Sequence, residues 1–304
     1  MFEELFPQYI FKAIANLPIK KLNEIRLRLN KKIVVTLQGK SYYLSQEGLT
    51  GNGEKAMVAD KFLIDEIVKR ACENSVYAYS NQIREGFLTL KGGARVGLCG
   101  EGVCENGNVK TLKNINSLAI RVPHEVKGCS VPAMEYLFRG GFLSTLIISP
   151  PGCGKTTFIR DLIYQLSLKN YCYNVLICDE RFEIANCFNG INTLDIGEFC
   201  DIASGVSKNY AFSNGIRAMR PDILVTDELG NEKDYEAVLS ASSCGTGLLA
   251  SIHAKDIDDL KLKQGFEKVL KEKVFDRFVV LSSRNGPGTI EGVFDENLRC
   301  ISYI

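Results

Sequence analysis

The feature that most constrains the fold of this 304-residue chain is an apolar run followed at once by a glycine-rich loop and a helical pattern. Residues 143–148 have the length and composition of a buried strand, and residues 158–163 continue as a helix. The segment between them reads Ser149-Pro150-Pro151-Gly152-Cys153-Gly154-Lys155-Thr156-Thr157. A strand, a glycine loop and a helix in this order turn backbone N–H groups inward at a helix N-terminus, which favours bound phosphate.

The loop has the features of a Walker A motif, and each of its residues has an expected role. Gly152 and Gly154 let the backbone N–H groups face phosphate, and Lys155 reaches the β- and γ-phosphates of ATP. Thr156 offers its hydroxyl to Mg²⁺, and Thr157 is expected near the α-phosphate. Nucleotide contact is also expected from Ser149, Pro150, Pro151 and Cys153. Ser149 replaces the first glycine of the strict pattern, so a Gly-Pro turn with a chance lysine is the alternative.

A second apolar run, at residues 223–226, ends in two acidic residues. We expect Asp227 to orient Mg²⁺ through water and Glu228 to polarise the attacking water. An acidic strand end is common in proteins and says little alone. Downstream of a phosphate loop, it is the second part of a nucleotide-hydrolysing site.

Two more apolar runs end in polar clusters. Residues 175–178 precede Asp179-Glu180-Arg181-Phe182-Glu183, and residues 248–252 precede His253. Parallel strands present their carboxyl ends at one edge of a sheet, where an open α/β sheet binds its ligand. We therefore expect Arg181, Glu183 and His253 to join Lys155 and Glu228 as catalytic residues. An ion pair within the cluster for Arg181, and a structural role for His253, are the alternatives.

The pattern as a whole predicts an α/β protein of two domains. A small α+β domain is expected over residues 1–125 and a P-loop ATPase domain with a parallel-rich sheet over residues 126–304. The expected elements of the first domain are a helix at 6–17, a hairpin of 31–37 and 41–44, a helix at 60–74 and short strands broken by glycines over 77–121. Those of the second are the four apolar runs, helices at 133–138 and 258–273, and strands at 277–281, 288–293 and 298–304.

Composition narrows the function classes. The chain is 45% hydrophobic and 24% charged, as in globular proteins, and its apolar runs fall short of the roughly 18 residues that span a bilayer. Eleven cysteines without a C-x-x-C pair indicate a reduced, cytoplasmic location. The chain has two histidines, His124 and His253, that could complete a zinc site together with cysteines, and no zinc site is expected. A formal net charge of +1 gives no reason to expect nucleic acid as a partner.

The four motifs in this order resemble those of the bacterial type II and type IV secretion ATPases. They are the Walker A loop, D-E-R-F-E at 179–183, I-R-A-M-R-P-D-I-L-V-T-D-E-L-G at 216–230 and S-I-H-A at 251–254. Over its whole length, with the ending D-R-F-V-V-L-S-S-R-N-G-P-G-T-I-E-G-V-F-D, the chain looks most like a sporulation protein of endospore-forming Firmicutes. Secretion ATPases usually carry Gly-Glu where this chain has Asp227-Glu228, which puts their magnesium geometry in doubt here.

The resemblance implies a RecA-like ATPase that forms a homohexameric ring with ATP bound between neighbouring subunits. Arginines from one subunit would complete the site of the next. The sequence offers Arg84, Arg95, Arg121, Arg217 and Arg220 for this role, and surface exposure is the alternative for each. The ring would lie in the mother-cell cytoplasm, peripheral to a membrane channel complex between mother cell and forespore.

Two other functions remain open from the sequence. A nucleic-acid translocase could share the core, although residues 141–304 carry more acidic than basic side chains. A ring that binds ATP to assemble, with little turnover, would carry the same motifs. The sequence favours an ATP-hydrolysing motor over both.

Overall fold

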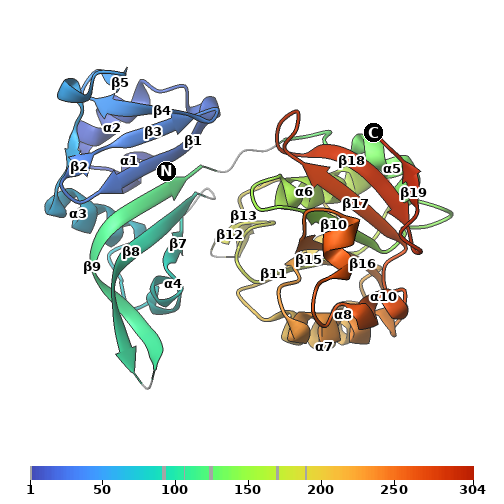
Figure 1. Cartoon of the computed structure of the whole chain (residues 1–304). Coiled ribbons are helices and arrows are strands. Elements are labelled where there is room, and N and C mark those ends of the chain that lie inside the picture. The colour runs from blue at the N-terminus through green and yellow to red at the C-terminus, as the bar shows by residue number, and fades with distance from the viewer. Residues whose placement is uncertain (1, 91–93, 106, 123–125, 169–170, 189) are drawn as a thin grey trace. The chain divides into compact units, whose positions relative to one another are not determined.

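The computed structural model describes residues 2–90, 94–105, 107–122, 126–168, 171–188 and 190–304. The chain divides into two compact units (Figure 1). One comprises Met1–His124 and Phe188–Thr193, and the other comprises Glu125–Cys187 and Leu194–Ile304. A single boundary at residues 125/126 therefore omits the short segment that groups with the first unit. His124 and residue 125 themselves lie outside the described residues.

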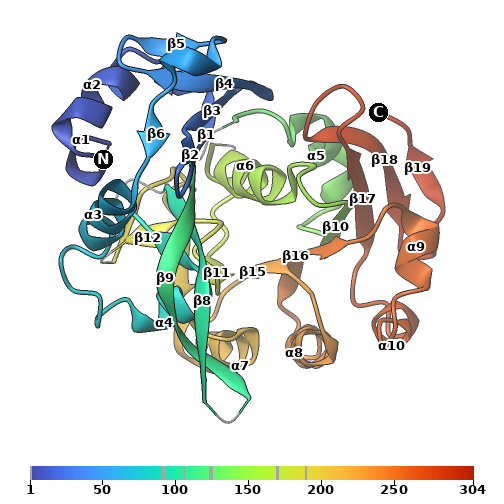
Figure 2. The same ribbon diagram turned by 60° about the vertical axis from the view of Figure 1, so that its left-hand side comes forward.

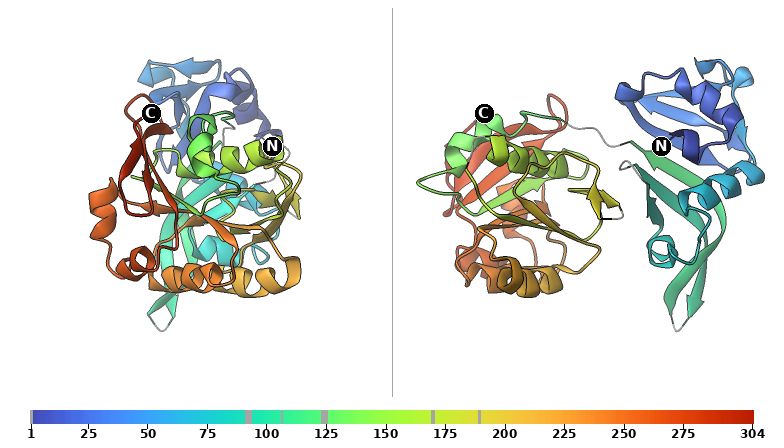
Figure 3. Two further views of the ribbon diagram at one scale, coloured as in Figure 1. Left: turned by 90° about the vertical axis from the view of Figure 1, so that its right-hand side faces the viewer. Right: turned by 180° about the vertical axis from the view of Figure 1, so that it is seen from behind.

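The first unit is built on an antiparallel seven-stranded sheet of order β5-β4-β3-β1-β9-β8-β7. Its strands are β1 (Leu22–Arg28), β3 (Val34–Leu37), β4 (Lys40–Ser45), β5 (Gly48–Thr50), β7 (Phe87–Thr89), β8 (Arg95–Glu105) and β9 (Asn108–Arg121). The unit also contains a small pair, β2 (Lys31–Lys32) and β6 (Val58–Ala59), and helices α1 (Phe2–Leu5), α2 (Gln8–Ala15), α3 (Lys61–Ala71) and α4 (Ser80–Arg84). The far parts of β8 and β9 pair only with each other and project as a ribbon (Figure 3).

The second unit is an eight-stranded sheet of order β14-β11-β15-β16-β10-β17-β18-β19. The first six strands in this order, β14, β11, β15, β16, β10 and β17, run parallel to one another. The pairs β17–β18 and β18–β19 are antiparallel. Their bounds are β10 Thr145–Ser149, β11 Val175–Asp179, β14 Cys200–Ser204, β15 Ile223–Glu228, β16 Gly247–His253, β17 Arg277–Ser282, β18 Thr289–Asp295 and β19 Cys300–Ser302. The predicted α/β class with a parallel-rich sheet is confirmed.

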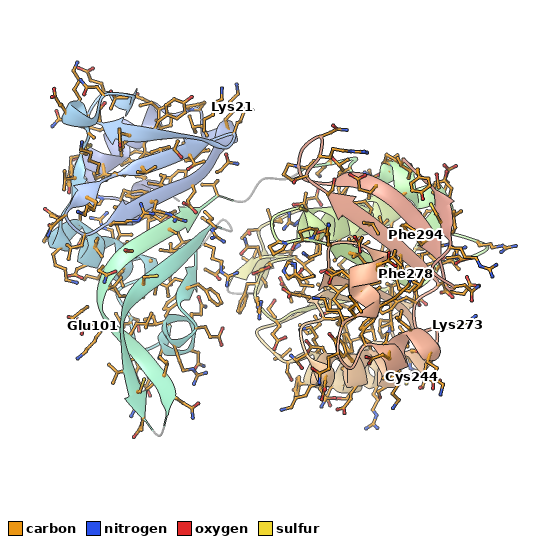
Figure 4. The ribbon with its side chains drawn as sticks, in the orientation of Figure 1. Lys21, Glu101, Cys244, Lys273, Phe278 and Phe294 are labelled. Carbon is orange, nitrogen blue, oxygen red and sulfur yellow. The ribbon has the colours of Figure 1, made fainter. Side chains whose placement is uncertain are left out.

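Helices cover both faces of this sheet (Figure 2). One face carries α5 (Val131–Leu137) and α6 (Lys155–Leu168), and the other carries α7 (Lys208–Met219), α8 (Glu232–Ser242), α9 (Ile257–Lys261) and α10 (Glu267–Lys271). Side chains alternate along β10, so that Ile147 packs with α6 while Leu146 and Ile148 pack with the second layer. Phe278 and Phe294 pair across β17 and β18 (Figure 4). In the part of the chain that is described, no helix is long and apolar enough to span a membrane.

Several predicted elements are confirmed and others are wrong in extent. The helix at 60–74 is α3, capped by Asp60 Oδ1, which accepts from Leu63 N at 2.7 Å. The helix at 6–17 is shorter, because Pro7 precedes α2 and breaks the pattern. The charged helix at 258–273 is two helices, α9 and α10, with Gly265 at φ +78° between them. Gly97, Gly100 and Gly102 lie inside β8 and do not separate short strands, and a Cβ on Gly100 would meet Lys113 O at 2.7 Å. Gly107 does lie in the turn between β8 and β9, whereas Gly92, Gly93 and Asn106 lie outside the described residues.

Candidate nucleotide site

The phosphate loop joins β10 directly to α6. The strand ends at Ser149 and the helix begins at Lys155. Gly152 and Gly154 have φ of +76° and +90°, a region that residues with a Cβ adopt at a cost of about 1–2 kcal/mol. A Cβ on Gly154 would also lie 2.9 Å from Gly288 N, so this position has no room for a side chain. Both predicted glycines are therefore required by the backbone of the loop.

The ammonium of Lys155 lies over the loop and contacts the end of a neighbouring strand. Its Nζ is 3.2 Å from Ser149 O, 3.3 Å from Pro150 O and 2.6 Å from Nδ1 of His253. Burial lowers the pKa of Lys155, and the nearby carboxylates of Glu228 and Asp227 act against that shift. A phosphate at this loop would supply the negative charge that the buried ammonium needs.

His253 connects the loop to the acidic end of β15. With Nδ1 accepting from Lys155, the imidazole carries its hydrogen on Nε2, which faces Glu228 Oε2 at 3.3 Å. Arg181 is more distant and more exposed, with Nη1 3.9 Å from the same carboxylate oxygen. The fold thus brings Lys155, His253, Glu228 and Arg181 together.

A second group of oxygen atoms gathers beside them. Thr156 Oγ1 donates to Asp227 Oδ1 at 3.0 Å, and Glu183 makes a side-chain hydrogen bond with Asp227. Burial, together with the charge of Glu183, raises the pKa of Asp227 well above its usual range. Two close carboxyl groups and a hydroxyl form a set that a hard cation would stabilise, so these residues fit Mg²⁺.

The rest of a magnesium coordination shell would come from outside the protein. Among the described residues, no group of three or more His, Cys, Asp or Glu side chains could hold a metal ion. Mg²⁺ is commonly held by one or two carboxylates together with substrate phosphates and water. The small set of protein oxygens around Asp227 matches that mode of binding.

Asp179 was assigned no role in the sequence analysis, yet it builds the loop that carries Arg181 and Glu183. Its carboxylate is fully buried and accepts from four backbone N–H groups. Those donors are Glu183, Ile184, Ala185 and Asn186, at 2.6–3.2 Å. Asp179 therefore fixes the loop so that Glu183 faces Asp227.

Lys208, at the start of α7, was also missed. Its buried ammonium lies 2.7 Å from Glu180 Oε2 and 3.5 Å from Asp234 Oδ1. Burial acts to lower the pKa of Lys208, but the two carboxylates outweigh it and raise the pKa. Asp234 also accepts from Gly230 N at 2.8 Å, so the network ties together the loops that follow β11 and β15.

The remaining predicted residues are distributed over both units. Thr157 is on α6, and Cys153 is buried within the loop. Arg217 lies in the last turn of α7 and Arg220 follows that helix with φ +49°. The other three arginines belong to the first unit, where Arg84 ends α4, Arg95 stacks on Phe87 at 3.8 Å and Arg121 Nε is 3.4 Å from Glu24 Oε2.

Solved structures with the same fold include two ATPase-related proteins. The Legionella pneumophila ATPase DotB superposes on this chain with a TM-score of 0.53 at 12% identity. The superposition covers 86% of this chain and 72% of the DotB chain. The pilus retraction motor PilT, solved with bound ADP, superposes with a TM-score of 0.56 at 14% identity, covering 90% and 78%. At these identities the similarity shows the fold, and it confirms the predicted RecA-like architecture of the secretion ATPases.

Sequence comparison adds a closer relationship. The stage III sporulation protein AA of Bacillus subtilis is 33% identical over 305 aligned residues, covering 98% of this chain and 96% of its own. Residues 8–301 match the family model described as "Sporulation stage III, protein AA". The match spans both units, including the phosphate loop and the strands around it. The chain belongs to the family of the stage III sporulation protein AA.

Proposed function

We propose that this protein is an ATP hydrolase that works as a motor in sporulation. The observation that carries the proposal is the meeting of Lys155, Thr156, Asp227, Glu228 and His253 at the carboxyl ends of β10, β15 and β16. Each of these groups has a defined task in phosphoryl transfer to water. The name of the B. subtilis relative supports a place in sporulation.

In the proposed reaction, the backbone N–H groups of residues 152–156 and the ammonium of Lys155 bind the phosphates. Glu228 accepts a proton from the attacking water, and His253 Nε2 orients that carboxylate. Mg²⁺ would be held by Thr156, Asp227 and Glu183. A bound Mg²⁺ would neutralise the negative charge that develops on the phosphates during hydrolysis. Arg181 is exposed enough to move toward the γ-phosphate.

We further propose that the active form is a cytoplasmic homohexameric ring, docked on a membrane channel complex of the sporulation apparatus. Arg84, Arg95, Arg121, Arg217 and Arg220 are the arginines that we propose for completing a neighbour's site. DotB is an ATPase and PilT is a pilus retraction motor, and their shared fold supports a mechanical use of ATP.

Steady-state hydrolysis measured over a range of protein concentrations tests the proposal. We expect turnover that rises steeply with concentration, is unaffected by single-stranded DNA or RNA, and disappears in Glu228→Gln. Strong stimulation by nucleic acid would point to a translocase instead. ATP-dependent assembly without turnover at any concentration would point to a nucleotide-gated scaffold.

A further inference from the structure

A short loop from the end of the second unit lies directly on the phosphate loop. Residues 283–288 connect β17 to β18, whose ladder closes at the pair Ser282 and Thr289. Gly288 N donates to Cys153 O at 2.8 Å, and a Cβ on Gly154 would lie within 3.4 Å of Pro287. Because β17 pairs directly with β10, this contact brings the β17–β18 loop against the phosphate loop of the proposed site.

The loop is held in shape by its own hydrogen bonds. Gly286 N donates to Ser283 O at 3.1 Å, and Thr289 Oγ1 donates to Gly286 O at 2.7 Å while accepting from Asn285 N at 3.2 Å. Arg284 Nη2 lies 3.1 Å from Glu291 Oε2 of β18. A surface that is fixed before a ligand arrives loses less conformational entropy on binding.

The topology indicates which end of a nucleotide would meet this loop. In the sheet, β16 and then β15 lie on one side of β10, and β17 lies on the other (Figure 2). The side chains of Lys155 and Thr156 turn toward the first side, where they contact His253 and Asp227. That contact places the γ-phosphate and Mg²⁺ toward β15 and β16.

The nucleoside is attached at the opposite end of the triphosphate. With the γ-phosphate drawn toward β15 and β16, the α-phosphate and its ribose lie toward β17. Residues 283–288 bound the phosphate loop on that side. They are therefore placed to meet the part of the ligand that the catalytic residues do not contact.

We propose that residues 283–288 form the wall that binds the base and ribose of the nucleotide, an inference that rests on the proposed function. Arg284 is 64% exposed while Glu291 fixes its guanidinium, so one planar face is open to stack on a nucleobase. Asn285 is exposed beside it, and its amide can both donate to and accept from a base edge. The phosphate loop then binds phosphate, and this loop supplies recognition of the nucleoside.

Calorimetry with two ligands separates the contributions of the loops. ADP carries a nucleoside and tripolyphosphate does not, and both are titrated with Mg²⁺ into the full-length protein. In Arg284→Ala we expect ADP affinity to fall about three- to thirtyfold, the range from an exposed to a desolvated cation–π contact, with tripolyphosphate affinity unchanged. Arg299→Ala removes an exposed arginine of the turn before β19 and serves as the matched control, with both affinities unchanged.

A second variant guards against compensation by the rest of the loop. Replacing residues 283–288 with Asn-Gly keeps the β17–β18 ladder, because a two-residue turn can close the pair Ser282 and Thr289. We expect this variant to lose more ADP affinity than Arg284→Ala and to keep tripolyphosphate binding. Wild-type ADP affinity in both variants, or an equal loss of both ligands, would overturn the nucleoside assignment.

Lys155→Ala distinguishes this inference from the proposed function. That variant should lose both ADP and tripolyphosphate. If it does so while the two loop variants bind ADP normally, the function stands and the nucleoside wall is refuted. If the wild-type protein binds neither ligand, the proposed function fails and the inference fails with it.

Discussion

At the scale of single residues, the site holds acidic groups in an environment that disfavours their charge. Asp227 hydrogen-bonds with Glu183 and Thr156, and its pKa is raised by burial first and by Glu183 second. An acid whose pKa is higher in the folded than in the unfolded state binds its proton more tightly when folded, so its protonated form stabilises the fold. This stability is lost as pH rises from the usual range of an aspartate toward the raised value. The nucleotide-free protein should therefore lose stability across that window.

Asp227→Asn tests this balance. An amide keeps the acceptor for Thr156 but removes the buried charge, so we expect the nucleotide-free protein to be more stable. Its melting temperature should rise by about 2–4 °C for each kcal/mol gained in the free energy of unfolding. The rise should be larger at pH 8 than at pH 5, and magnesium-dependent hydrolysis should disappear. Asp201→Asn, at an exposed position of β14, is the control for charge removal. A lower melting temperature at both pH values would contradict the expectation.

Asp179→Asn should have the opposite effect on stability. The two carboxylate oxygens each accept from two backbone N–H groups, whereas an amide offers one oxygen and places an NH₂ group against the other two donors. Buried donors without partners cost about 1–3 kcal/mol each, so we expect the free energy of urea unfolding to fall by about 2–6 kcal/mol. Asp258→Asn, whose side chain is 88% exposed, should change stability little. An unchanged midpoint for Asp179→Asn would refute its role in holding the loop.

At the scale of elements, the contact between the phosphate loop and the β17–β18 loop makes its own prediction. Gly152 and Gly154 both have positive φ, but only Gly154 lies against Gly288. Gly152→Ala should cost about 1–2 kcal/mol from backbone strain alone. Gly154→Ala should cost more and should speed hydrogen exchange at the Gly288 amide, which is bonded to Cys153 O. Equal exchange in the two variants would show that the loops are not coupled.

The elements also show what sequence patterns can and cannot predict. The runs that became β10, β11, β15 and β16 are continuously apolar because both faces of the sheet are covered, so their pattern was readable. β14 was missed because Asp201 and Ser204 interrupt its short apolar pattern and because none of its residues is fully buried at the edge of the sheet. A strand of that composition is recognised through its pairing with β11, which the sequence does not display.

The residues of the candidate site also divide into those that the sequence predicts and those that it does not. Lys155, Thr156 and Asp227 were predicted because a local motif defines their chemistry. Lys208 was missed because its role comes from Glu180 and Asp234, which reach it from the β11 loop and from α8. The spacing of residues along the chain does not reveal partners that come together only in the folded structure. The phosphate loop and acidic strand ends were therefore predictable, and the network that positions them was not.

At the scale of the whole molecule, the two units have separate cores. The buried cluster of the first unit runs from Phe2 to Ile120, and the clusters on the two faces of the second sheet draw on residues from Ala133 to Val293. Apart from the first-unit arginines proposed for a neighbour's site, every proposed catalytic, nucleotide-binding or magnesium residue lies in the second unit, at residues 149–253 or in the loop of residues 283–288. Nucleotide binding and subunit cooperation should therefore be separable by truncation.

We expect residues 126–304 alone to fold and to bind ATP with Mg²⁺ at close to the affinity of the full chain, because their core and phosphate loop are self-contained. Turnover by this fragment should lack the steep dependence on concentration that the full chain is expected to show, because Arg84, Arg95 and Arg121 are absent. Calorimetry and light scattering, with Lys155→Ala in the fragment as the control for specific binding, check both parts. A fragment that assembles and hydrolyses ATP like the full chain would show that the first unit contributes nothing to the active site, and would leave Arg217 and Arg220 of the second unit as the arginines to test.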